Sequence, residues 1–508
     1  MTPSDKQQKI YDTWINTMYN IVINAVAGAG KSFTLLELMK LCKKRTLYLA
    51  FNKSIQKEFE EKIVKNNLTQ YCKALTLHAL GLMAIKNVTK SFTIEDNKVY
   101  KKLFEFEKKN KSYFKFIPYT IKKSVYFSLY SLYNSYRLNL NTDLDFLENS
   151  LRERDIALIY PDDKEEFEAI FLKFIIFMED YNKKRESGYL IDFLDMIYLP
   201  VRYKFKIPIN PEYLMIDEVQ DLTALQHSFV DKLLTENGVE KWIAVGDRNQ
   251  AIYGFSGANS SSFDILVNKE NVIELPLDIC YRCDLTIIAK ANSVYNVMQG
   301  FKTTEGIVST YNFDLKKDNN KINDFYNNIK PGSLIICRNK KPLITLLIDL
   351  MELDIECSLM GDDILLYLTS FLKDYKDLTI WNAETVIKSN IEDFSKKCKD
   401  YEKYKVDLLE ENYSNFLLLK KLVSPQSKIS DLIDKIKKLF EEHPNDIKLC
   451  TIHKSKGLEA DIVYILNEDL IGKQAVSKEQ KIQEKNLMYV ARTRAKKEMY
   501  FLNIKNNK

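Results

Sequence analysis

The sequence has no uninterrupted apolar run that approaches the roughly 20 residues of a membrane-spanning helix. Its first residues, MTPSDKQQKIYDTW, are polar and do not resemble a secretory signal. The eight cysteines are scattered, and the one CxxC pattern, Cys280 to Cys283, has no second pair at zinc spacing. We therefore expect an intracellular protein with reduced thiols, cytoplasmic, or nuclear if its host is eukaryotic.

The sequence also lacks a large excess of positive or negative charge. The 75 Lys and Arg residues face 70 Asp and Glu residues, which leaves a formal net charge of +5. A nucleic-acid groove would have to be a local concentration of basic residues. At 508 residues, 45% of them hydrophobic, the chain is too long for one core and should divide into several globular domains.

What the sequence does contain is a phosphate-binding pattern near its start. Residues 21–23 are apolar, residues 25–32 are AVAGAGKS, and residues 33–38 have helical spacing. This strand, small-residue loop and helix start would let backbone N–H groups converge on an anion. Lys31 would then bridge the β- and γ-phosphates, and the Ser32 hydroxyl would ligate Mg²⁺. The alternative is a tight strand–helix turn with a solvent-facing lysine.

Strands and helices alternate after this loop. Residues 45–50 and 74–78 are predicted strands, and residues 55–63 are a predicted helix between them. This alternation indicates a parallel sheet with right-handed crossovers. Ligands collect at the carboxyl ends of such strands, where Phe51, Thr76 and His78 lie.

Residues 90–185 are rich in Lys, Tyr and Phe, have largely helical periodicity and show no catalytic spacing. Aromatic residues interleaved with lysines suit a groove for single-stranded nucleic acid, but they equally suit an ordinary helical insertion. Residues 188–196 are predicted to form an amphipathic helix. Gln7, on a polar first helix, could pair with an adenine edge or be simply solvated.

Two later strands end in polar residues. The apolar run 213–216 leads into Asp217 and Glu218, and the run 242–245 leads into a loop with Gln250 and Phe255. After a phosphate loop, Asp217 could hold the Mg²⁺ shell while Glu218 orients and deprotonates water. Gln250 could reach a γ-phosphate, and Phe255 is available for stacking.

Taken together, these segments resemble superfamily 1 helicases of the UvrD/Rep/PcrA type, which are ATP-driven 3′→5′ DNA translocases. The most specific motifs are LMIDEVQD at 214–221, GD at 246–247 with QAIY at 250–253, TIHKSKGLE at 451–459 and YVARTRA at 489–495. Matches extend from about Gln7 to Met499 and so frame nearly the whole chain.

The resemblance implies specific roles. ATP would be bound by Gln7, Ala27, Gly28, Ala29, Gly30, Lys31, Ser32, Phe33, Tyr281, Arg282, Gly457, Glu459 and Arg494. Catalysis would depend on Lys31, Asp217, Glu218, Gln250, Arg282 and Arg494, with Mg²⁺ on Ser32 and Asp217. Single-strand contacts would come from Phe51, Asn52, Thr76, His78, Tyr253, Phe255, Arg338 and His453.

Four positions depart from the family pattern. Cys280 and Cys283 replace the usual Asn and Ser around Tyr281 and Arg282, and Ser256 stands where Arg is frequent. Phe33 replaces an arginine that the family often places beside the adenine, which bears on the selectivity for ATP over other nucleoside triphosphates.

The resemblance further implies an α/β fold of two RecA-like P-loop motor domains, each with a mainly helical insertion. The first motor domain would comprise residues 1–90 and 186–275, with an insertion at 91–185. The second would comprise residues 276–364 and 446–508, with a shortened insertion at 365–445.

The implied function is an ATP- and Mg²⁺-dependent 3′→5′ DNA helicase acting on single strands and single/double-strand junctions in repair, recombination or replication. Three alternatives remain open. They are a translocase that strips proteins without unwinding, a nucleotide-gated DNA-binding subunit, and a superfamily 1 RNA helicase.

Overall fold

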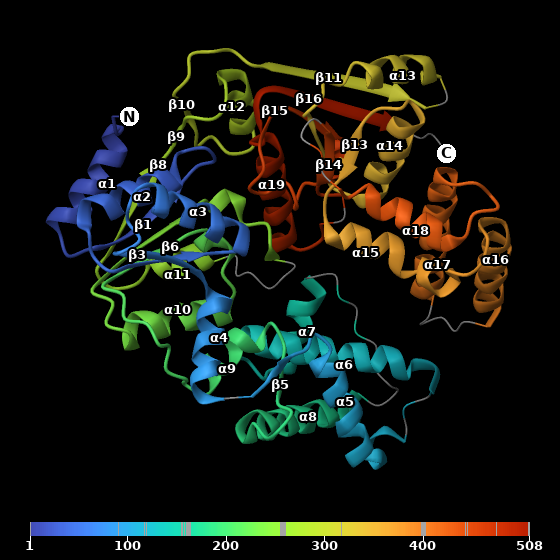
Figure 1. Cartoon of the computed structure of the whole chain (residues 1–508), viewed down its shortest axis with the longest axis horizontal. Coiled ribbons are helices and arrows are strands. Elements are labelled where there is room, and N and C mark those ends of the chain that lie inside the picture. The colour runs from blue at the N-terminus through green and yellow to red at the C-terminus, as the bar shows by residue number, and fades with distance from the viewer. Residues whose placement is uncertain are drawn as a thin grey trace. The chain divides into compact units, whose positions relative to one another are not determined.

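The computed structural model describes residues 2–89, 91–115, 117, 119–153, 156, 158, 164–254, 261–315, 317–397, 403–441, 443, 446–473 and 475–505. The chain folds into two compact units. Unit 1 comprises Met1–Tyr281 and Val476–Asn486, and unit 2 comprises Arg282–Ala475 and Leu487–Lys508. Each unit contains one six-stranded sheet (Figure 1).

The sheet of unit 1 has the strand order β3-β2-β6-β7-β1-β8, with every neighbouring pair parallel. Its strands are β1 Asn20–Ala25, β2 Thr46–Ala50, β3 Cys72–Thr76, β6 Tyr213–Ile216, β7 Lys241–Gly246 and β8 Val272–Leu277. Its helices are α1 Asp5–Asn16, α2 Lys31–Cys42, α3 Lys53–Lys65, α4 Leu77–Val88, α9 Asp195–Arg202, α10 Ala224–Glu236 and α11 Ser262–Val267. The central strands β2, β6 and β7 are almost wholly buried and mostly apolar because both faces of a parallel sheet are covered, whereas the edge strands β3 and β8 carry exposed positions. The short strand β9, Ile279–Cys280, follows β8.

Two predictions in this unit are wrong in detail. The predicted strand 74–78 ends at Thr76, because the Thr76 hydroxyl accepts the Ala79 N–H and caps α4. Leu77 and His78 therefore lie in the first turn of a helix. The predicted helix 188–196 begins instead with the short strand β5, Leu190–Ile191, which pairs with β4, Thr93–Ile94. Only the residues from Asp195 onward are helical.

The segment between β4 and β5 forms four helices, α5 Lys98–Lys109, α6 Tyr119–Asn139, α7 Leu144–Glu153 and α8 Lys164–Lys184. They lie together at the far end of α4 and α9 from the sheet (Figure 1). Their apolar faces join the core of the sheet domain, since Phe106, Phe171 and Phe174 belong to the same buried cluster as Tyr198 and Leu214. The helical segment and the sheet therefore share one continuous core.

Unit 2 contains a second parallel sheet, of order β11-β16-β15-β12-β14-β13. Its strands are β11 Ile307–Asp314, β12 Leu334–Cys337, β13 Cys357–Leu359, β14 Ile447–Thr451, β15 Ala460–Leu466 and β16 Ala495–Lys505, and β10 is Gln299–Gly300. Its helices are α12 Leu285–Asn292, α13 Asn319–Asn327, α14 Lys340–Glu352, α15 Asp362–Ser370, α16 Ile380–Lys397, α17 Lys403–Leu419 and α18 Ile429–Lys438. The helix α19, Lys478–Arg492, begins in unit 1 and ends in unit 2. The prediction of an α/β fold with two parallel sheets is confirmed.

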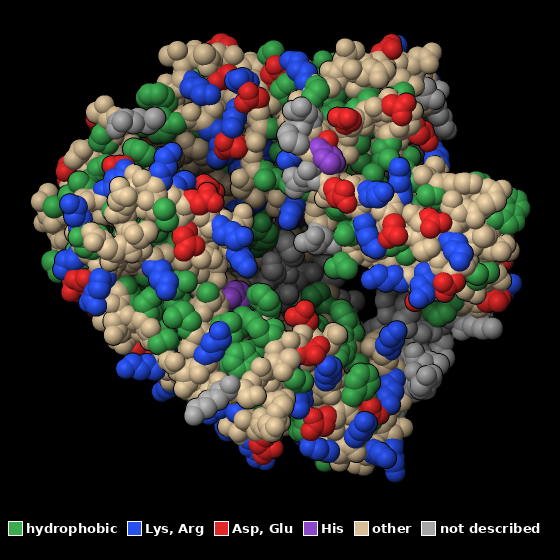
Figure 2. Space-filling view, in the orientation of Figure 1, with side chains coloured by type: hydrophobic (Ala, Val, Ile, Leu, Met, Phe, Trp, Pro, Cys, Tyr) green, Lys and Arg blue, Asp and Glu red, His purple; other side chains and the backbone are tan. Residues whose placement is uncertain are grey.

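The surface mixes charges of both signs. Figure 2 shows basic and acidic side chains interspersed over the visible face, with hydrophobic side chains reaching the surface in the region of α4 and α9. In the described part of the chain, no helix is both long and apolar enough to span a membrane.

Candidate nucleotide and nucleic-acid site

The loop that follows β1 has the backbone of an anion cradle. Gly28 and Gly30 adopt positive φ angles of 72° and 80°, a region that glycine enters without steric cost. Helix α2 begins directly after Gly30, with Lys31, Ser32 and Phe33 as its first turn. The N–H groups of a first helical turn have no partner within the helix and carry the positive end of its dipole. Ala27, Gly28, Ala29 and Gly30 thus form a loop suited to phosphate oxygens.

Lys31 lies against the two carboxylates that follow β6. Its ammonium group pairs with Glu218, and the carboxylate of Asp217 is close enough to act on the same charge. Burial alone would lower the pKa of Lys31, but Glu218 and Asp217 outweigh it and hold that pKa above its usual value. The strands β1 and β6 are parallel, so their carboxyl ends bring these residues to one edge of the sheet.

Asp217 is buried and held from two sides. The hydroxyl of Tyr48, on the neighbouring strand β2, donates to Asp217 Oδ2 at 2.5 Å, and the backbone N–H of Glu218 donates to Oδ1 at 2.9 Å. The Tyr48 ring is itself fixed by stacking on Phe59, with ring centroids 3.7 Å apart. Burial raises the pKa of Asp217, and the neighbouring Glu218 raises it further. Sequence reasoning gave Tyr48 no role, because nothing in a strand pattern shows which carboxylate a tyrosine will reach.

The backbone of Glu218 is left-handed, with a φ of 52°. This conformation costs a non-glycine residue about 1–2 kcal/mol. The turn directs the Glu218 side chain to Lys31, and the Gln220 amide donates to the other Glu218 oxygen. Gln220 in turn accepts the backbone N–H of Asp247 at 3.1 Å. Gln220 is a second residue that the sequence interpretation left without a role, although it lies two positions after Glu218.

Gln250 lies at the same edge, after β7. Its amide nitrogen donates to the buried carboxylate of Asp247 at 2.7 Å. Burial raises the pKa of Asp247, and the hydrogen bond from Gln250 partly offsets this. Lys31, Asp217, Glu218 and Gln250 are thus all at the carboxyl ends of β1, β6 and β7.

The residues predicted to contact the nucleobase surround the start of α2. Gln7 is 4% exposed, and its side chain accepts the Ser4 N–H at 3.0 Å and donates to Thr34 Oγ1 at 3.1 Å. The backbone N–H of Tyr281 donates to the Gly28 carbonyl at 3.0 Å. A pocket of about 250 Å³ lies between α1 and α2 and is lined by Pro3, Gln8, Tyr11, Ile15, Phe33, Glu37 and Leu41; of the residues predicted to bind ATP, only Phe33 lines it.

Four predicted residues of unit 2 lie together. Arg282 Nε pairs with Glu459 Oε2 at 2.5 Å, and Lys496 pairs with the other oxygen at 2.8 Å. Burial alone would raise the pKa of Glu459, but these cations hold it below its usual value. Arg494 is 2% exposed and donates to the Leu458 carbonyl, next to Gly457, at 3.1 Å and to the Val490 carbonyl at 2.9 Å.

The predicted single-strand contacts of unit 1 form two groups. Phe51 stacks on Tyr253, with ring centroids 5.9 Å apart and an interplanar angle of 15°. His78 packs against Phe193, with centroids 5.3 Å apart. Asn52 and Thr76 cap α3 and α4, and the Ala50–Thr76 pairing of β2 with β3 brings both helix starts to one edge. Phe193 is 59% exposed and was missed because it fell within a predicted amphipathic helix.

The remaining predicted contacts are Arg338, His453 and Phe255. Arg338 and His453 follow the adjacent strands β12 and β14 of unit 2, whose Cys337 and Thr451 are paired. Phe255 lies outside the described residues, as does Ser256.

Comparison with protein families adds the deciding observation. The model of the UvrD/REP helicase N-terminal domain matches residues 4–270, more than half of the 508 residues. The chain belongs to the UvrD/Rep helicase family. The model of the UvrD-like helicase C-terminal domain matches residues 446–502, in unit 2. The resemblance inferred from the motifs is confirmed, and with it the prediction that the chain is a helicase enzyme.

Three relatives of this UvrD/Rep-family chain illustrate the similarity. A probable DNA helicase II homologue of Mycoplasma genitalium is 24% identical and aligns with 96% of this chain and 83% of its own length. The F-box DNA helicase protein 1 of Schizosaccharomyces pombe is 23% identical, over 98% of this chain and 57% of its own length. The ATP-dependent DNA helicase Rep of Buchnera aphidicola is 25% identical, over 54% of this chain and 40% of its own length. The chain thus spans most of the first relative, somewhat more than half of the second and less than half of the third.

Proposed function

We propose that this chain hydrolyses ATP to move 3′→5′ along single-stranded DNA and to separate strands at single/double-strand junctions, in repair, recombination or replication. The observation that carries the proposal is the ion pair of Lys31 with Glu218, flanked by Asp217 and Gln250, beside a glycine loop at a helix start. Family membership and the names of the relatives, which are DNA helicases, support DNA as the substrate. The polarity rests on the family resemblance.

The nucleotide site fits a magnesium complex of a nucleoside triphosphate. A glycine loop at a helix N-terminus suits phosphates, and one buried carboxylate with a nearby hydroxyl suits Mg²⁺, which keeps water and phosphate ligands. Asp217 and Ser32 would hold Mg²⁺, which when bound neutralises charge on the phosphate oxygens. Lys31 would leave Glu218 for the phosphates, and Glu218 would then be able to orient water and accept its proton. Arg282 and Arg494 would stabilise the charge that develops on the γ-phosphoryl group.

The aromatic groups of unit 1 would carry the single strand. Phe51 with Tyr253 and His78 with Phe193 offer ring faces at the edge where β2, β3 and β7 end. Base–aromatic stacking contributes about 1–3 kcal/mol per base and tolerates any sequence. Contacts of this kind can be broken and remade at each step, as movement along a strand requires.

The test measures ATP hydrolysis with and without single-stranded DNA, beside Lys31→Ala and the matched control Lys40→Ala on the same helix. Strong stimulation by DNA, lost in Lys31→Ala and kept in Lys40→Ala, would support a DNA-driven motor. Duplexes with 3′ or 5′ tails then test polarity, and opening of only the 5′-tailed duplex would refute it. ATP binding without hydrolysis in the unmodified protein would overturn the proposal.

A further inference from the structure

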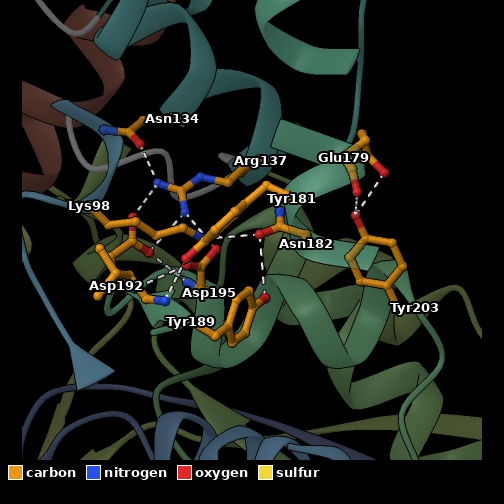
Figure 3. Close-up of polar contacts among 11 residues, drawn as sticks. Lys98, Asn134, Arg137, Glu179, Tyr181, Asn182, Tyr189, Asp192, Asp195 and Tyr203 are labelled. Atoms are coloured by element: carbon orange, nitrogen blue, oxygen red, sulfur yellow. Dashed lines mark hydrogen bonds and ion pairs between the residues drawn. The ribbon is translucent and has the colours of Figure 1, made fainter. Parts of the chain in front are cut away.

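Four charged side chains form a buried cluster in unit 1. Lys98 Nζ lies 2.5 Å from Asp195 Oδ2, and Arg137 donates to both Asp192 oxygens at 2.8 Å and to Asp195 Oδ1 at 2.9 Å. All four residues are between 0 and 6% exposed. Figure 3 shows Lys98 and Arg137 pointing at the two carboxylates, with Asn182 and Tyr189 alongside. We call these four residues the buried charge cluster.

The cluster joins the helical segment to the turn before α9. Lys98 begins α5 and Arg137 lies in the last turn of α6, whereas Asp192 and Asp195 flank the start of α9. Burial lowers the pKa of Lys98, whereas Arg137 outweighs the effect of burial on Asp192 and lowers the pKa of that carboxyl. Buried ion pairs seldom add net stability over apolar residues of the same volume, whereas removing one partner is costly. In some proteins such pairs instead favour one arrangement of the elements that they join.

The turn that the buried charge cluster holds places the ring of Phe193 at the surface. The Asp192 N–H donates to Asp195 Oδ2 and the Asp195 N–H donates to Asp192 Oδ1, both at 2.9 Å, which closes a tight turn. Both carboxylates face inward to the cations, and Phe193 between them is 59% exposed and packs against His78. The turn at residues 192–195 is therefore held by ion pairs on its inner side and exposes the ring of Phe193 on its outer side.

We propose that the buried charge cluster is a positioning device through which the helical segment Lys98–Lys184 holds Phe193 beside His78 for stacking on a base of single-stranded DNA. The inference rests on the proposed function, since it needs DNA to be the ligand. In this arrangement Arg137 and Lys98 touch no nucleic acid and act only through Phe193. The lysine- and aromatic-rich segment would thereby contribute to DNA binding through buried residues rather than through its surface lysines.

The experiment is a double-mutant cycle in the full chain, with the dissociation constant of a fluorescent oligo(dT) as the readout. Phe193→Ala should weaken binding about 5- to 150-fold, the loss of one stacked base. Arg137→Lys should weaken it by a similar factor in the unmodified chain and by less than about twofold when Phe193→Ala is already present. Asp192→Asn keeps the side-chain volume and is the second variant, for the case in which Arg137→Lys does not fold.

The control is Glu179→Gln, which disturbs a separate half-buried group on α8 in which Tyr198 and Tyr203 donate to that carboxylate. It should lower the melting temperature without changing the affinity for DNA. If the double variant's loss of affinity equals the product of the losses in Arg137→Lys and Phe193→Ala, the two residues act independently and the positioning role is overturned. An unchanged affinity in Phe193→Ala would also overturn it, because this ring then binds no base. Failure of the unmodified chain to bind oligo(dT) would instead refute the proposed function.

Discussion

The ammonium group of Lys31 and the carboxylate of Glu218 form an ion pair at the carboxyl edge of the first sheet, although 187 positions separate them in the chain. Each partner is half-buried. In the proposed reaction Lys31 binds the phosphates, whereas Glu218 orients water and accepts its proton. A triphosphate and Glu218 would therefore compete for the same cation.

Replacing Glu218 by Gln should separate binding from hydrolysis. The amide cannot accept the proton from water, so the hydrolysis rate should fall about 10²- to 10⁴-fold. Because the amide also competes less for Lys31, the affinity for ATP should be unchanged or tighter. Phosphate-release kinetics and titration with a fluorescent ATP analogue measure the two effects. A variant that hydrolyses ATP at the normal rate would exclude Glu218 as the base.

Removing the Tyr48 hydroxyl should loosen Asp217 without disturbing the core. Tyr48→Phe keeps the ring stacked on Phe59 and deletes the hydrogen bond to Asp217 Oδ2. Because loss of such an outer partner typically weakens a metal site 10- to 100-fold, the Mg²⁺ concentration for half-maximal hydrolysis should rise about tenfold. Tyr198→Phe, which removes a buried hydroxyl from Glu179, is the matched control and should leave the Mg²⁺ dependence unchanged. Equal Mg²⁺ dependence in the two variants would contradict the prediction.

Replacing Arg282 or Arg494 should have similar effects on hydrolysis but different effects on stability. Either Arg282→Ala or Arg494→Ala should lower hydrolysis about 10³- to 10⁵-fold if each stabilises the γ-phosphoryl charge. Only Arg494 is also bonded to the Leu458 and Val490 carbonyls in a buried position, so only Arg494→Ala should lower the melting temperature strongly. Differential scanning fluorimetry beside the rate assay makes the comparison, and an equal loss of stability in both would refute it.

A methyl group at Gly81 should disrupt the contact between α4 and α9. A Cβ there would lie 1.7 Å from the Met196 carbonyl oxygen, so the helices must separate. We expect Gly81→Ala to lower the free energy of unfolding by about 3 kcal/mol. Gly238→Ala, with a φ of 68° and open space around it, should cost only about 1 kcal/mol of backbone strain. Denaturant titration measures both, and the reverse order would show that the α4–α9 crossing is not tight.

His227 should make unit 1 less stable in acid. Its Nε2 lies 2.7 Å from Ser262 Oγ, which donates to the Val219 carbonyl, and burial lowers the pKa of His227 from 6.5 to about 4. Asp231 raises this pKa and Lys269 lowers it, both less than burial does. Between these pH values the unfolded chain binds one more proton, so stability falls as the pH drops from 6.5 towards about 4, by about 3 kcal/mol in total. His227→Gln should flatten this slope in unfolding measured against pH, and an unchanged slope would assign the acid sensitivity to other groups.

Much of the fold could be predicted because its signals are local. Apolar runs such as 213–216 and 242–245 are strands by composition, and the AVAGAGKS loop specifies its own turn through Gly28 and Gly30. The misplaced boundaries depended on single hydrogen bonds. The Thr76 cap turned Leu77 and His78 into a helix, and pairing with β4 turned residues 190–191 into a strand.

The sequence by itself determined the family and the two parallel sheets, and it predicted which polar residues follow the strand ends, because each of these motifs is contiguous in the chain. The tertiary structure alone decided that Tyr48 holds Asp217 and that Lys98 and Arg137 hold the turn of Phe193. These partners are 169, 97 and 55 positions apart. Such contacts follow from strand order and helix packing, which bring remote side chains together in a way that no local pattern encodes.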